Sequence, residues 1–460
     1  MQHRFDPTIL REYDIRGIVD RTLTEADARA IGRAFATIAR TRGAKTIAVG
    51  YDGRLSSPAM ADAVVEGLTA GGADAVRIGM SPTPMLYFAC YHLDGVDGGI
   101  QITGSHNPPD YNGFKMILLK KPFFGQDIQE IGRVAAAGEF ASGAGRVSVA
   151  DINQAYVERM LADYTPGRAL KVVWDCGNGA TGPTVEALVA RLPGAHTVLN
   201  APVDGTFPVH HPDPTLPETL AQLQAAVTEA GAELGIAFDG DGDRIGVIDG
   251  QGEVLWADQL LVMLARDVLR EHPGATIIAD VKASQVLFDA VRAAGGEPLM
   301  YRTGHSLIKA KMAEIGAPLA GEMSGHIFYA DRYFGYDDAL YVAVRTLGVL
   351  ATGEGTLADF RKTLPVVLNT PELRFTCSEE RKFVVPNEVH ERLKAEGADV
   401  NATDGVRVNT PDGWWLLRAS NTQDVLVARC EAMDEAGLGR LKGALAGQLA
   451  ASGVELPAGF

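Results

Sequence analysis

The sequence predicts an α/β fold over most of its length, followed by a C-terminal region of the α+β type. Short apolar runs alternate with amphipathic helical stretches from about residue 45 to residue 350. This alternation is typical of parallel or mixed sheets joined by right-handed crossovers. After Pro365 the alternation becomes sparse, which indicates a domain of another kind. A chain of 460 residues exceeds the usual size of one domain, so we expect several.

The first unit, residues 1–150, is predicted from apolar runs typical of buried strands and from helical stretches between them. Pro58 near the start of the predicted helix at 58–70 supports this helix, because the N–H that proline lacks would have no helical partner there. Residues 136–146, rich in glycine and alanine, indicate a first linker region. The predicted elements are strands at 45–50, 75–79 and 98–102, helices at 58–70 and 84–92, and an extended run at 114–119.

Three further units follow, at residues 151–253, 254–365 and 366–460. The three α/β units share a layout of strand, functional loop and helix, which hints at internal duplication. The second unit is predicted to contain strands at 170–175 and 234–238 and a hairpin at 245–255. The third is predicted to contain helices at 258–270 and 338–350 and a strand at 276–280. The last is predicted to contain a hairpin around 411–413 and a final helix from Gly437.

Composition excludes several classes of function. The net charge of −16 argues against broad binding to nucleic acids or anionic membranes, which need a positive field. No apolar run approaches the ~18 residues of a membrane helix, and the N-terminus lacks the apolar core of a signal peptide. The four cysteines lie far apart, so we expect buried, reduced thiols. We therefore expect a cytoplasmic protein, with any positive charge for an anionic substrate concentrated in a cleft.

Ser105 lies in the segment Thr-Gly-Ser-His-Asn-Pro-Pro at 103–109, directly after the predicted strand at 98–102. Open α/β folds place their chemistry where strands end. His106 and Lys115 add hydrogen-bond donors, and the two prolines stiffen the loop. The alternative is an ordinary turn serine. A serine acyl hydrolase is disfavoured because the G-x-S-x-G spacing is absent, and because adjacent Ser and His side chains do not easily hydrogen-bond.

The loop Asp-Gly-Asp-Gly-Asp-Arg at 239–244 also follows an apolar strand. Its alternating aspartates can face one point because glycine allows a sharp backbone path. Few, hard oxygen ligands suit Mg²⁺. An EF-hand calcium loop is excluded because Arg244 stands where that motif has glycine, and Gly250 where it has glutamate. A turn with solvated aspartates stays open as the alternative.

Two later loops suit the binding of a polar ligand. Glu322 and Ser324, in Gly-Glu-Met-Ser-Gly-His at 321–326, can hydrogen-bond neighbouring sugar hydroxyls. The segment Arg-Ala-Ser-Asn-Thr at 418–422 offers a guanidinium, two hydroxyls and an amide, a set that can cradle a phosphate. Solvated turns and a capped helix start are the alternatives. His210 and His211 are adjacent, and in extended chain the side chains of neighbours point to opposite sides, so the two do not face one metal ion. We interpret this segment as part of a rigid connecting loop.

Taken in order, these four loops resemble those of the α-D-phosphohexomutase superfamily, with the bacterial phosphomannomutase/phosphoglucomutase group as the nearest match. The resemblance covers essentially the whole chain. It implies four domains around a central cleft, three similar mixed α/β sheet domains and a C-terminal α+β domain that resembles the TATA-binding protein. It also implies Mg²⁺ as the metal and a hexose 1,6-bisphosphate as intermediate and activator.

The resemblance also implies a role for each site residue. Ser105 is the phosphoserine, and the Mg²⁺ ligands are Ser105, Asp239, Asp241 and Asp243. Contacts to the phosphoryl group and general acid/base candidates are Arg16, His106, Lys115, Arg244 and His326. Further substrate contacts are Tyr13, Lys282, His305, Glu322 and Ser324. The phosphate that is not transferred lies against Arg418, Ser420, Asn421 and Thr422.

The implied reaction interconverts hexose 1-phosphate and hexose 6-phosphate of mannose, glucose or both. The substrate is a small phosphosugar, and we expect a monomer or a dimer with no nucleic-acid or membrane partner. Phosphoglucosamine mutase is the near rival, but it usually has glutamine where this chain has Met323. A metal-dependent phosphomonoesterase would use the same residues and pass the phosphoryl group to water, and a sugar-phosphate sensor would lack turnover. The preference between glucose and mannose, the pathway and the resting phosphorylation of Ser105 stay open.

Overall fold

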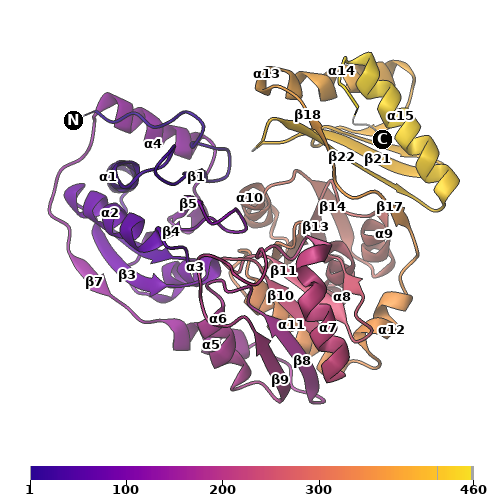
Figure 1. Cartoon of the computed structure of the whole chain (residues 1–460), viewed down its shortest axis with the longest axis horizontal. Coiled ribbons are helices and arrows are strands. Elements are labelled where there is room, and N and C mark those ends of the chain that lie inside the picture. Colours follow the sequence, from indigo (N-terminus) through magenta and orange to yellow (C-terminus); the bar gives the residue numbers. More distant parts are fainter. Residues whose placement is uncertain (1, 422, 457–460) are drawn as a thin grey trace.

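The computed structural model describes residues 2–421 and 423–456, which form four sheets with helices packed against them (Figure 1). The first three sheets are mixed and carry helices, and the fourth belongs to an α+β domain, so the predicted four-domain α/β architecture is confirmed. In Figure 1 the C-terminal domain, orange to yellow, stands apart from the first domain, indigo to purple, with the second and third domains below them.

The first domain has a sheet of seven strands in the order β1-β5-β4-β2-β3-β7, with β6 paired to β5. Its strands are β1 (Ile15–Ile18), β2 (Thr46–Tyr51), β3 (Asp74–Met80), β4 (Gly98–Ile102), β5 (Tyr111–Leu118), β6 (Lys121–Pro122) and β7 (Val147–Val149). Its helices are α1 (Glu25–Thr41), α2 (Ser57–Ala70), α3 (Thr83–His92) and α4 (Gln126–Ala137). The chain after α4 returns to β7 on β3, so the predicted linker at 136–146 connects elements within this domain.

The second domain has a sheet of five strands in the order β12-β11-β10-β8-β9. Its strands are β8 (Leu170–Asp175), β9 (Gly194–Leu199), β10 (Leu234–Phe238), β11 (Ile245–Asp249) and β12 (Val254–Leu255). Its helices are α5 (Asn153–Leu161), α6 (Gly182–Val189), the 3-10 turn η1 (Pro217–Leu220) and α7 (Ala221–Ala230). The predicted hairpin at 245–255 is present as the antiparallel pair β11 and β12.

The third domain has a sheet of four strands in the order β14-β13-β15-β16. Its strands are β13 (Thr276–Asp280), β14 (Glu297–Tyr301), β15 (Leu319–Gly321) and β16 (Ile327–Tyr329). Its helices are α8 (Ala257–Glu271), α9 (Gln285–Ala293), α10 (His305–Ile315), α11 (Ala339–Thr352) and α12 (Leu357–Lys362). Asp338 caps α11, because its side chain accepts a hydrogen bond from the backbone N–H of Tyr341.

The fourth domain has an antiparallel sheet of six strands, β17-β22-β21-β20-β19 with β18 also paired to β22. Its strands are β17 (Leu368–Asn369), β18 (Leu373–Thr376), β19 (Asp399–Asn401), β20 (Val406–Thr410), β21 (Gly413–Ala419) and β22 (Val425–Ala432). Its helices are α13 (Glu379–Lys382), α14 (Val384–Ala395) and α15 (Glu435–Ala451). Helix α15 begins before the predicted Gly437, because Asp434 caps it by accepting from the N–H of Gly437.

The shared layout of strand, functional loop and helix is wrong, whereas the extended run predicted at 114–119 and the hairpin predicted at 245–255 are present after the first two loops. In each domain the functional loop leads from a parallel strand into an antiparallel one: β4 to β5, β10 to β11, and β15 to β16. The apolar run after each loop is short and continuous, as in Ile245–Asp249, and suits a buried strand better than a helix. The three loops therefore form hairpin tips at the edge where the parallel strands end.

One continuous apolar core joins the first three domains. It includes buried side chains from α3, α5, α8 and α11, among them Tyr87, Tyr156, Leu264 and Leu340. The fourth domain has a separate core beneath its sheet, built around Trp415 and packed by α14 and α15. This arrangement fixes the first three functional loops relative to one another and leaves the fourth on a separately packed domain. Among the described residues, no helix has both the length and the apolarity to cross a bilayer.

The loop with the adjacent histidines is tied to the second sheet by an ion pair. His210 Nε2 lies 2.9 Å from Asp175 Oδ2, at the end of β8, and the His210 side chain is 16% exposed. The hydrogen bond to Asp175 raises the pKa of His210 above its ordinary value of 6.5. The stabilisation is therefore complete below pH 6.5 and is lost as the pH rises through the raised pKa.

We expect His210→Gln to destabilise the protein by about 1 kcal/mol at pH 5.5, and by less at pH 8.5. Differential scanning fluorimetry of wild type and variant at the two pH values measures this. The difference in melting temperature should shrink at the higher pH. An equal difference at both pH values would contradict the assigned ion pair.

Candidate active site

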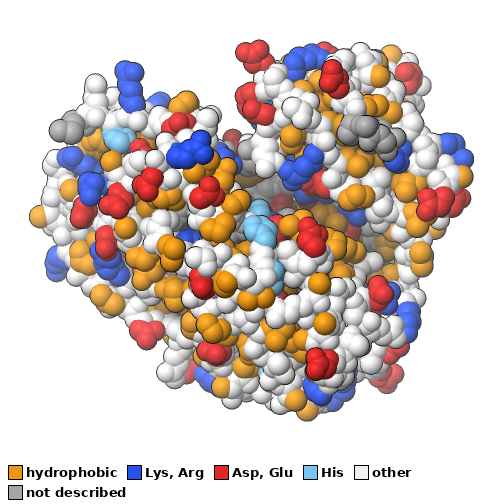
Figure 2. All heavy atoms as spheres, viewed as in Figure 1, with side chains coloured by type: hydrophobic (Ala, Val, Ile, Leu, Met, Phe, Trp, Pro, Cys, Tyr) orange, Lys and Arg blue, Asp and Glu red, His pale blue; other side chains and the backbone are white. Residues whose placement is uncertain are grey.

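The four functional loops meet at one cavity of about 770 Å³ between the C-terminal domain and the other three. Figure 2 shows the hollow at this place, with histidine side chains at its floor. Thr422 lies outside the described residues. The predicted residues that line the cavity are Tyr13, Arg16, Ser105, His106, Lys115, Arg244, Lys282, His305, Glu322, Ser324, His326, Arg418, Ser420 and Asn421. The predicted metal ligands Asp239, Asp241 and Asp243 lie fully buried beneath its wall.

Ser105 is held with its hydroxyl against a carboxylate. Its Oγ donates to Asp239 Oδ2 at 2.8 Å. Ser105 as a whole is only 2% exposed. Its backbone N–H donates to Thr103 Oγ1 at 2.8 Å. Ser105 has φ of 50°, in the left-handed region that non-glycine residues seldom adopt. The loop is thus built in an uncommon conformation that presents one hydroxyl to the acidic cluster.

The expectation that Ser105 and His106 would not hydrogen-bond is wrong. Ser105 Oγ lies 3.0 Å from His106 Nδ1. The left-handed backbone at Ser105 removes the alternation of neighbouring side chains that extended chain imposes. Burial, together with Arg244 and Arg16, holds the pKa of His106 well below its ordinary value. A neutral imidazole therefore lies beside the serine oxygen, whose hydrogen is donated to Asp239.

Asp239, Asp241 and Asp243 each offer a carboxylate oxygen, and these oxygens lie within 4.8 Å of one another. Asp241 Oδ1 is buried and has no hydrogen-bond partner, and Asp243 Oδ1 is buried with His326 Nε2 3.3 Å away. Burial raises the pKa of Asp239 well above its ordinary value, and the charges of Asp241 and Asp243 raise it further. Three buried carboxylates with clustered oxygens, one of them unpartnered, fit a hard divalent cation, so the donor set is that of a metal site.

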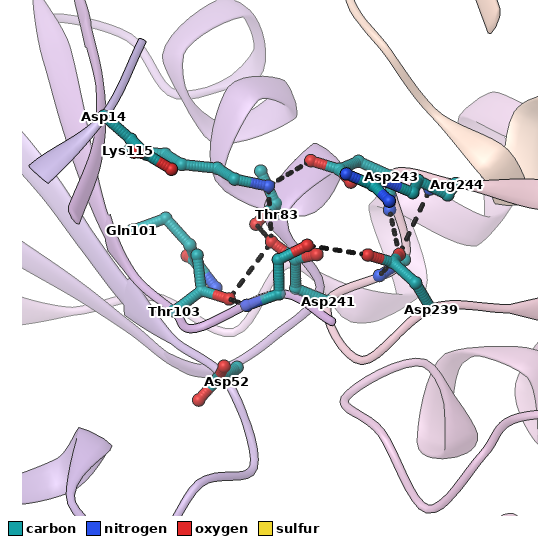
Figure 3. Close-up of polar contacts among 12 residues, drawn as sticks. Asp14, Asp52, Thr83, Gln101, Thr103, Lys115, Asp239, Asp241, Asp243 and Arg244 are labelled. Atoms are coloured by element: carbon teal, nitrogen blue, oxygen red, sulfur yellow. Dashed lines mark hydrogen bonds and ion pairs between the residues drawn. The ribbon is translucent and has the colours of Figure 1, made fainter. Parts of the chain in front are cut away.

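Lys115 on β5 balances part of this negative charge (Figure 3). Its Nζ donates to Asp241 Oδ2 at 2.8 Å and also to Asp243. Burial alone would lower the pKa of Lys115, but Asp241 and Asp243 raise it above its ordinary value. Lys115 is therefore a fixed cation at the cluster, beside the Ser105 hydroxyl.

Two arginines lie close to the same loop. Arg16 Nη1 donates to Asn107 Oδ1 at 2.6 Å, and the guanidinium pairs with Asp14. The backbone N–H of Arg244 donates to Asp239 Oδ1 at 3.1 Å, and its guanidinium lies 4.0 Å from Asp213. Arg16 and Arg244 both line the cavity, so they place positive charge where a phosphoryl group on Ser105 would lie.

Sequence reasoning missed residues that hold the cluster from behind. Thr83 Oγ1 donates to Asp241 Oδ2 at 2.5 Å, and Thr103 Oγ1 donates to the same oxygen at 3.1 Å. Asp52 and Arg54 follow β2 and support the Ser105 loop. Asp52 and Arg54 directly follow an apolar strand, and this position could have predicted a role near the site. Nothing local marks Thr83, whose contact is made across domains.

The loop at 321–326 contains an ion pair between Glu322 and His326. Glu322 Oε1 accepts from the N–H of Gly304 at 2.6 Å, and Glu322 Oε2 lies 3.2 Å from His326 Nδ1. Ser324 Oγ lies 2.8 Å from the same His326 nitrogen, and His326 Nε2 lies 3.3 Å from Asp243 Oδ1. Burial opposes the charged imidazole, but Asp243 and Glu322 raise the pKa of His326 to about 9. His326 is therefore an imidazolium at neutral pH.

A second histidine faces the first. The ring of His305 stacks on that of His326 with 5.4 Å between the ring centroids. Burial lowers the pKa of His305, and the nearby ammonium of Lys309 lowers it further. His305 Nδ1 lies 3.3 Å from Asp337 Oδ2. One neutral and one charged imidazole thus stand together at the cavity wall.

The C-terminal domain closes the far side of the cavity. Arg418 Nε donates to Asp404 Oδ2 at 2.9 Å, and the buried Nη2 of Arg418 has no hydrogen-bond partner. Asn421 Nδ2 donates to Tyr13 Oη, and this Oη donates to the carbonyl of Thr303 at 2.8 Å. These contacts join the N-terminal segment, the third domain and the fourth domain across the cavity.

Lys282 also points at this end of the cavity. Its Nζ lies 3.3 Å from Glu372 Oε2 and 4.0 Å from Asp280 Oδ2. Lys282 and Arg418 thus bring two cationic side chains to the far end of the cavity, each beside a carboxylate. The cavity therefore has cationic side chains at both ends, near Ser105 and at the C-terminal domain.

Comparison with known sequence families matches all four domains. The matching descriptions are "Phosphoglucomutase/phosphomannomutase, alpha/beta/alpha domain I" at residues 7–142, domain II at 154–252, domain III at 256–367, and the C-terminal domain at 372–448. A phosphomannomutase/phosphoglucomutase from Pseudomonas aeruginosa is 43% identical over 98% of this chain and 98% of its own length.

Solved structures agree with this. A phosphoglucomutase/phosphomannomutase family protein from Burkholderia thailandensis has a TM-score of 0.94 and 43% identity, covering 98% of this chain and 100% of its own. An N-acetylphosphoglucosamine mutase from Aspergillus fumigatus, solved with GlcNAc-6P and magnesium, has a TM-score of 0.64 and 12% identity. The structural alignment covers 96% of each chain and shows a similar fold.

Proposed function

Since this chain belongs to the phosphoglucomutase/phosphomannomutase family and is a phosphohexomutase, we propose that it interconverts the 1-phosphates and 6-phosphates of both glucose and mannose. The reaction proceeds through phospho-Ser105 and a hexose 1,6-bisphosphate. Relatives named for both sugars support the substrate choice. Met323, in place of the glutamine typical of phosphoglucosamine mutases, supports it as well.

The observation that carries the proposal is the contact between Ser105 Oγ and Asp239 Oδ2 at 2.8 Å, at the edge of the buried aspartate cluster. A phosphoryl group on Ser105 would lie between the metal ligands and the cavity. We propose Mg²⁺ as the metal, held by Asp239, Asp241, Asp243 and an oxygen of phospho-Ser105. When bound, the metal neutralises negative charge on the phosphoryl oxygens.

Phosphoryl transfer spreads charge over the phosphoryl oxygens, so catalysis is mainly positioning and charge neutralisation. Lys115, Arg16 and Arg244 supply fixed positive charge at this end. His106, whose Nδ1 lies 3.0 Å from Ser105 Oγ, is proposed to orient the serine oxygen. His326, kept charged by its acidic neighbours, is a candidate to donate a proton to the sugar oxygen.

The bisphosphate must rotate within the site so that its other phosphate reaches Ser105. A cavity of about 770 Å³ with a cationic group at each end suits a ligand with two phosphates. The separate core of the fourth domain supports a further step, in which this domain moves so that the intermediate can turn while Arg418 stays close. Glu322 and Ser324 are proposed to contact sugar hydroxyls shared by glucose and mannose.

One copy of the chain supplies residues from all four loops, so we propose that a monomer is active, with a dimer as the alternative. We further propose a cytoplasmic enzyme that supplies sugar phosphates for polysaccharide synthesis. The domain boundaries near residues 150, 253 and 365 are part of the same proposal.

We expect Arg418→Ala to raise KM for α-glucose 1-phosphate by at least ~10-fold, because a guanidinium–phosphate contact is lost. Metal affinity should change less than threefold, since Arg418 belongs to another domain than the aspartates. Steady-state kinetics over a range of substrate and Mg²⁺ concentrations measures both. Arg440→Ala, at an exposed ion pair with Asp412 in the same domain, is the matched control. An unchanged KM would remove Arg418 from the phosphate site.

Phosphorus NMR of the purified protein with α-glucose 1-phosphate, Mg²⁺ and a trace of glucose 1,6-bisphosphate tests the proposal. A hexose 6-phosphate signal that grows without inorganic phosphate is expected. Growth of inorganic phosphate would instead mean that water takes the phosphoryl group, and the phosphomonoesterase alternative would replace the mutase. Mannose 1-phosphate in a parallel tube tests the second sugar.

A further inference from the structure

A single guanidinium lies beneath the Ser105 loop. Arg54 follows β2, is 1% exposed, and is not among the residues that line the cavity. Its nitrogens donate to four carbonyls of the loop and its extension and to one carboxylate. The acceptors are Ser105 O at 2.7 Å, Asn107 O at 2.6 Å, Pro108 O at 2.5 Å, Tyr111 O at 3.0 Å and Asp52 Oδ2 at 3.2 Å.

This set uses every N–H that an arginine side chain has. A guanidinium carries five N–H donors in a fixed planar fork. Here Nη1 and Nη2 each serve two carbonyls, and Nε serves Asp52. A lysine ammonium has three donors that radiate from one point, so it cannot reach the same acceptors. The loop is therefore wrapped around a shape that only arginine presents.

The loop conformation depends on this contact. Ser105 at φ of 50° has a less favourable backbone than an ordinary residue, so other contacts must hold it. Asp52 Oδ2 accepts from the N–H of Gly104 at 3.0 Å and so joins Arg54 to the preceding residue. A Cβ on Gly104 would lie 2.3 Å from Arg54 Nε. Glycine at 104 thus allows the guanidinium to lie directly under the serine.

The second domain covers the other face of the guanidinium. The ring of Phe207 lies with its centroid 5.2 Å from Arg54 Cζ. Phe207 is itself in the left-handed region, with φ of 49°. Its loop continues to Asp213, which pairs with Arg244. Arg54 is therefore enclosed between the Ser105 loop of the first domain and a loop of the domain that carries the aspartates.

We propose that Arg54 is a positioning residue for phosphoryl transfer, which sets Ser105 Oγ against Asp239 at the metal site. It binds the carbonyls of Ser105 and of the chain after it, while Asp52 binds the N–H of Gly104, and Arg54 does not line the cavity. The proposal rests on the proposed function, because it concerns the placement of the phosphoryl carrier. A misplacement of about 1 Å at a reacting group can cost ~100-fold in rate.

The test compares Arg54→Lys with wild type in the mutase reaction. We expect kcat to fall by ~100-fold or more, while KM for α-glucose 1-phosphate changes by less than threefold, because Arg418 and Glu322 are untouched. The phosphorus NMR signal of phospho-Ser105 should shift or broaden in the variant. Arg345→Lys is the matched control, because Arg345 is also buried and ion-paired, to Asp331 in the third domain. It should lose thermal stability and keep kcat within about threefold.

Gly104→Ala is the second variant and keeps the arginine. Its Cβ must displace Arg54, so the same fall in kcat with retained KM is expected. The proposal is overturned if folded Arg54→Lys keeps kcat within about threefold of wild type, or if Gly104→Ala does. It is also overturned if Arg345→Lys loses kcat as strongly, since the effect would then be general destabilisation. A wild-type protein without any phosphoserine signal after incubation with glucose 1,6-bisphosphate would instead refute the proposed function.

Discussion

Replacement of Ser105 with alanine is expected to lower kcat of the mutase reaction by at least ~10⁴-fold. The Ser105 hydroxyl is the group in the loop that lies against Asp239 of the metal cluster, and its loss removes the covalent step. Ser105 Oγ makes its contacts to Asp239 and His106 and leaves the backbone hydrogen bonds of the loop to other atoms. The variant should therefore stay folded.

The measurement pairs the coupled assay of glucose 6-phosphate formation with phosphorus NMR after incubation with glucose 1,6-bisphosphate. Wild type should gain a phosphoserine signal and Ser105→Ala should not. Ser142→Ala, on the surface of the same domain, is the control and should behave as wild type. Activity near that of wild type in Ser105→Ala would assign the phosphoryl carrier to another residue.

The parts of the site that sequence predicted are those in which neighbouring residues carry the chemistry. Asp239, Asp241 and Asp243 alternate with glycines, so one short segment sets the whole donor cluster. Glu322 and Arg418 likewise lie in short polar segments next to apolar strands. The end of a buried strand is a place that a sequence marks clearly, and all four loops lie at such ends.

The parts that sequence did not predict depend on backbone conformation or on contacts between domains. The Ser105–His106 contact depends on the left-handed φ of Ser105, which a serine in the sequence does not predict. Thr83 meets Asp241 across 158 positions of chain. The charge on His326 arises because folding buries it between Asp243 and Glu322. Such properties belong to the assembled site and have no local pattern.

Removal of the divalent metal is expected to abolish turnover, and Asp241→Asn to lower kcat by ~10³-fold at saturating Mg²⁺. The aspartate cluster has more negative charge than Lys115 can balance, as the raised pKa of Asp239 indicates. Without a cation, burial and the repulsion from Asp241 and Asp243 favour a proton on Asp239, the carboxyl group that Ser105 Oγ contacts. With asparagine at 241, Thr83 and Thr103 keep a partner oxygen, so the fold should survive.

The metal can be followed without any assay of turnover, because a ligand that binds the folded state raises the melting temperature. After treatment with EDTA, stepwise addition of Mg²⁺ should raise the melting temperature of wild type and do so only at much higher concentration in Asp241→Asn. Asp249→Asn is the matched control, since Asp249 is equally buried in the second domain but pairs with Arg361. It should be less stable than wild type and keep the same Mg²⁺ dependence. Full turnover after exhaustive chelation would mean that the reaction needs no metal. An Asp241→Asn melting curve that responds to Mg²⁺ as wild type does would place the metal elsewhere.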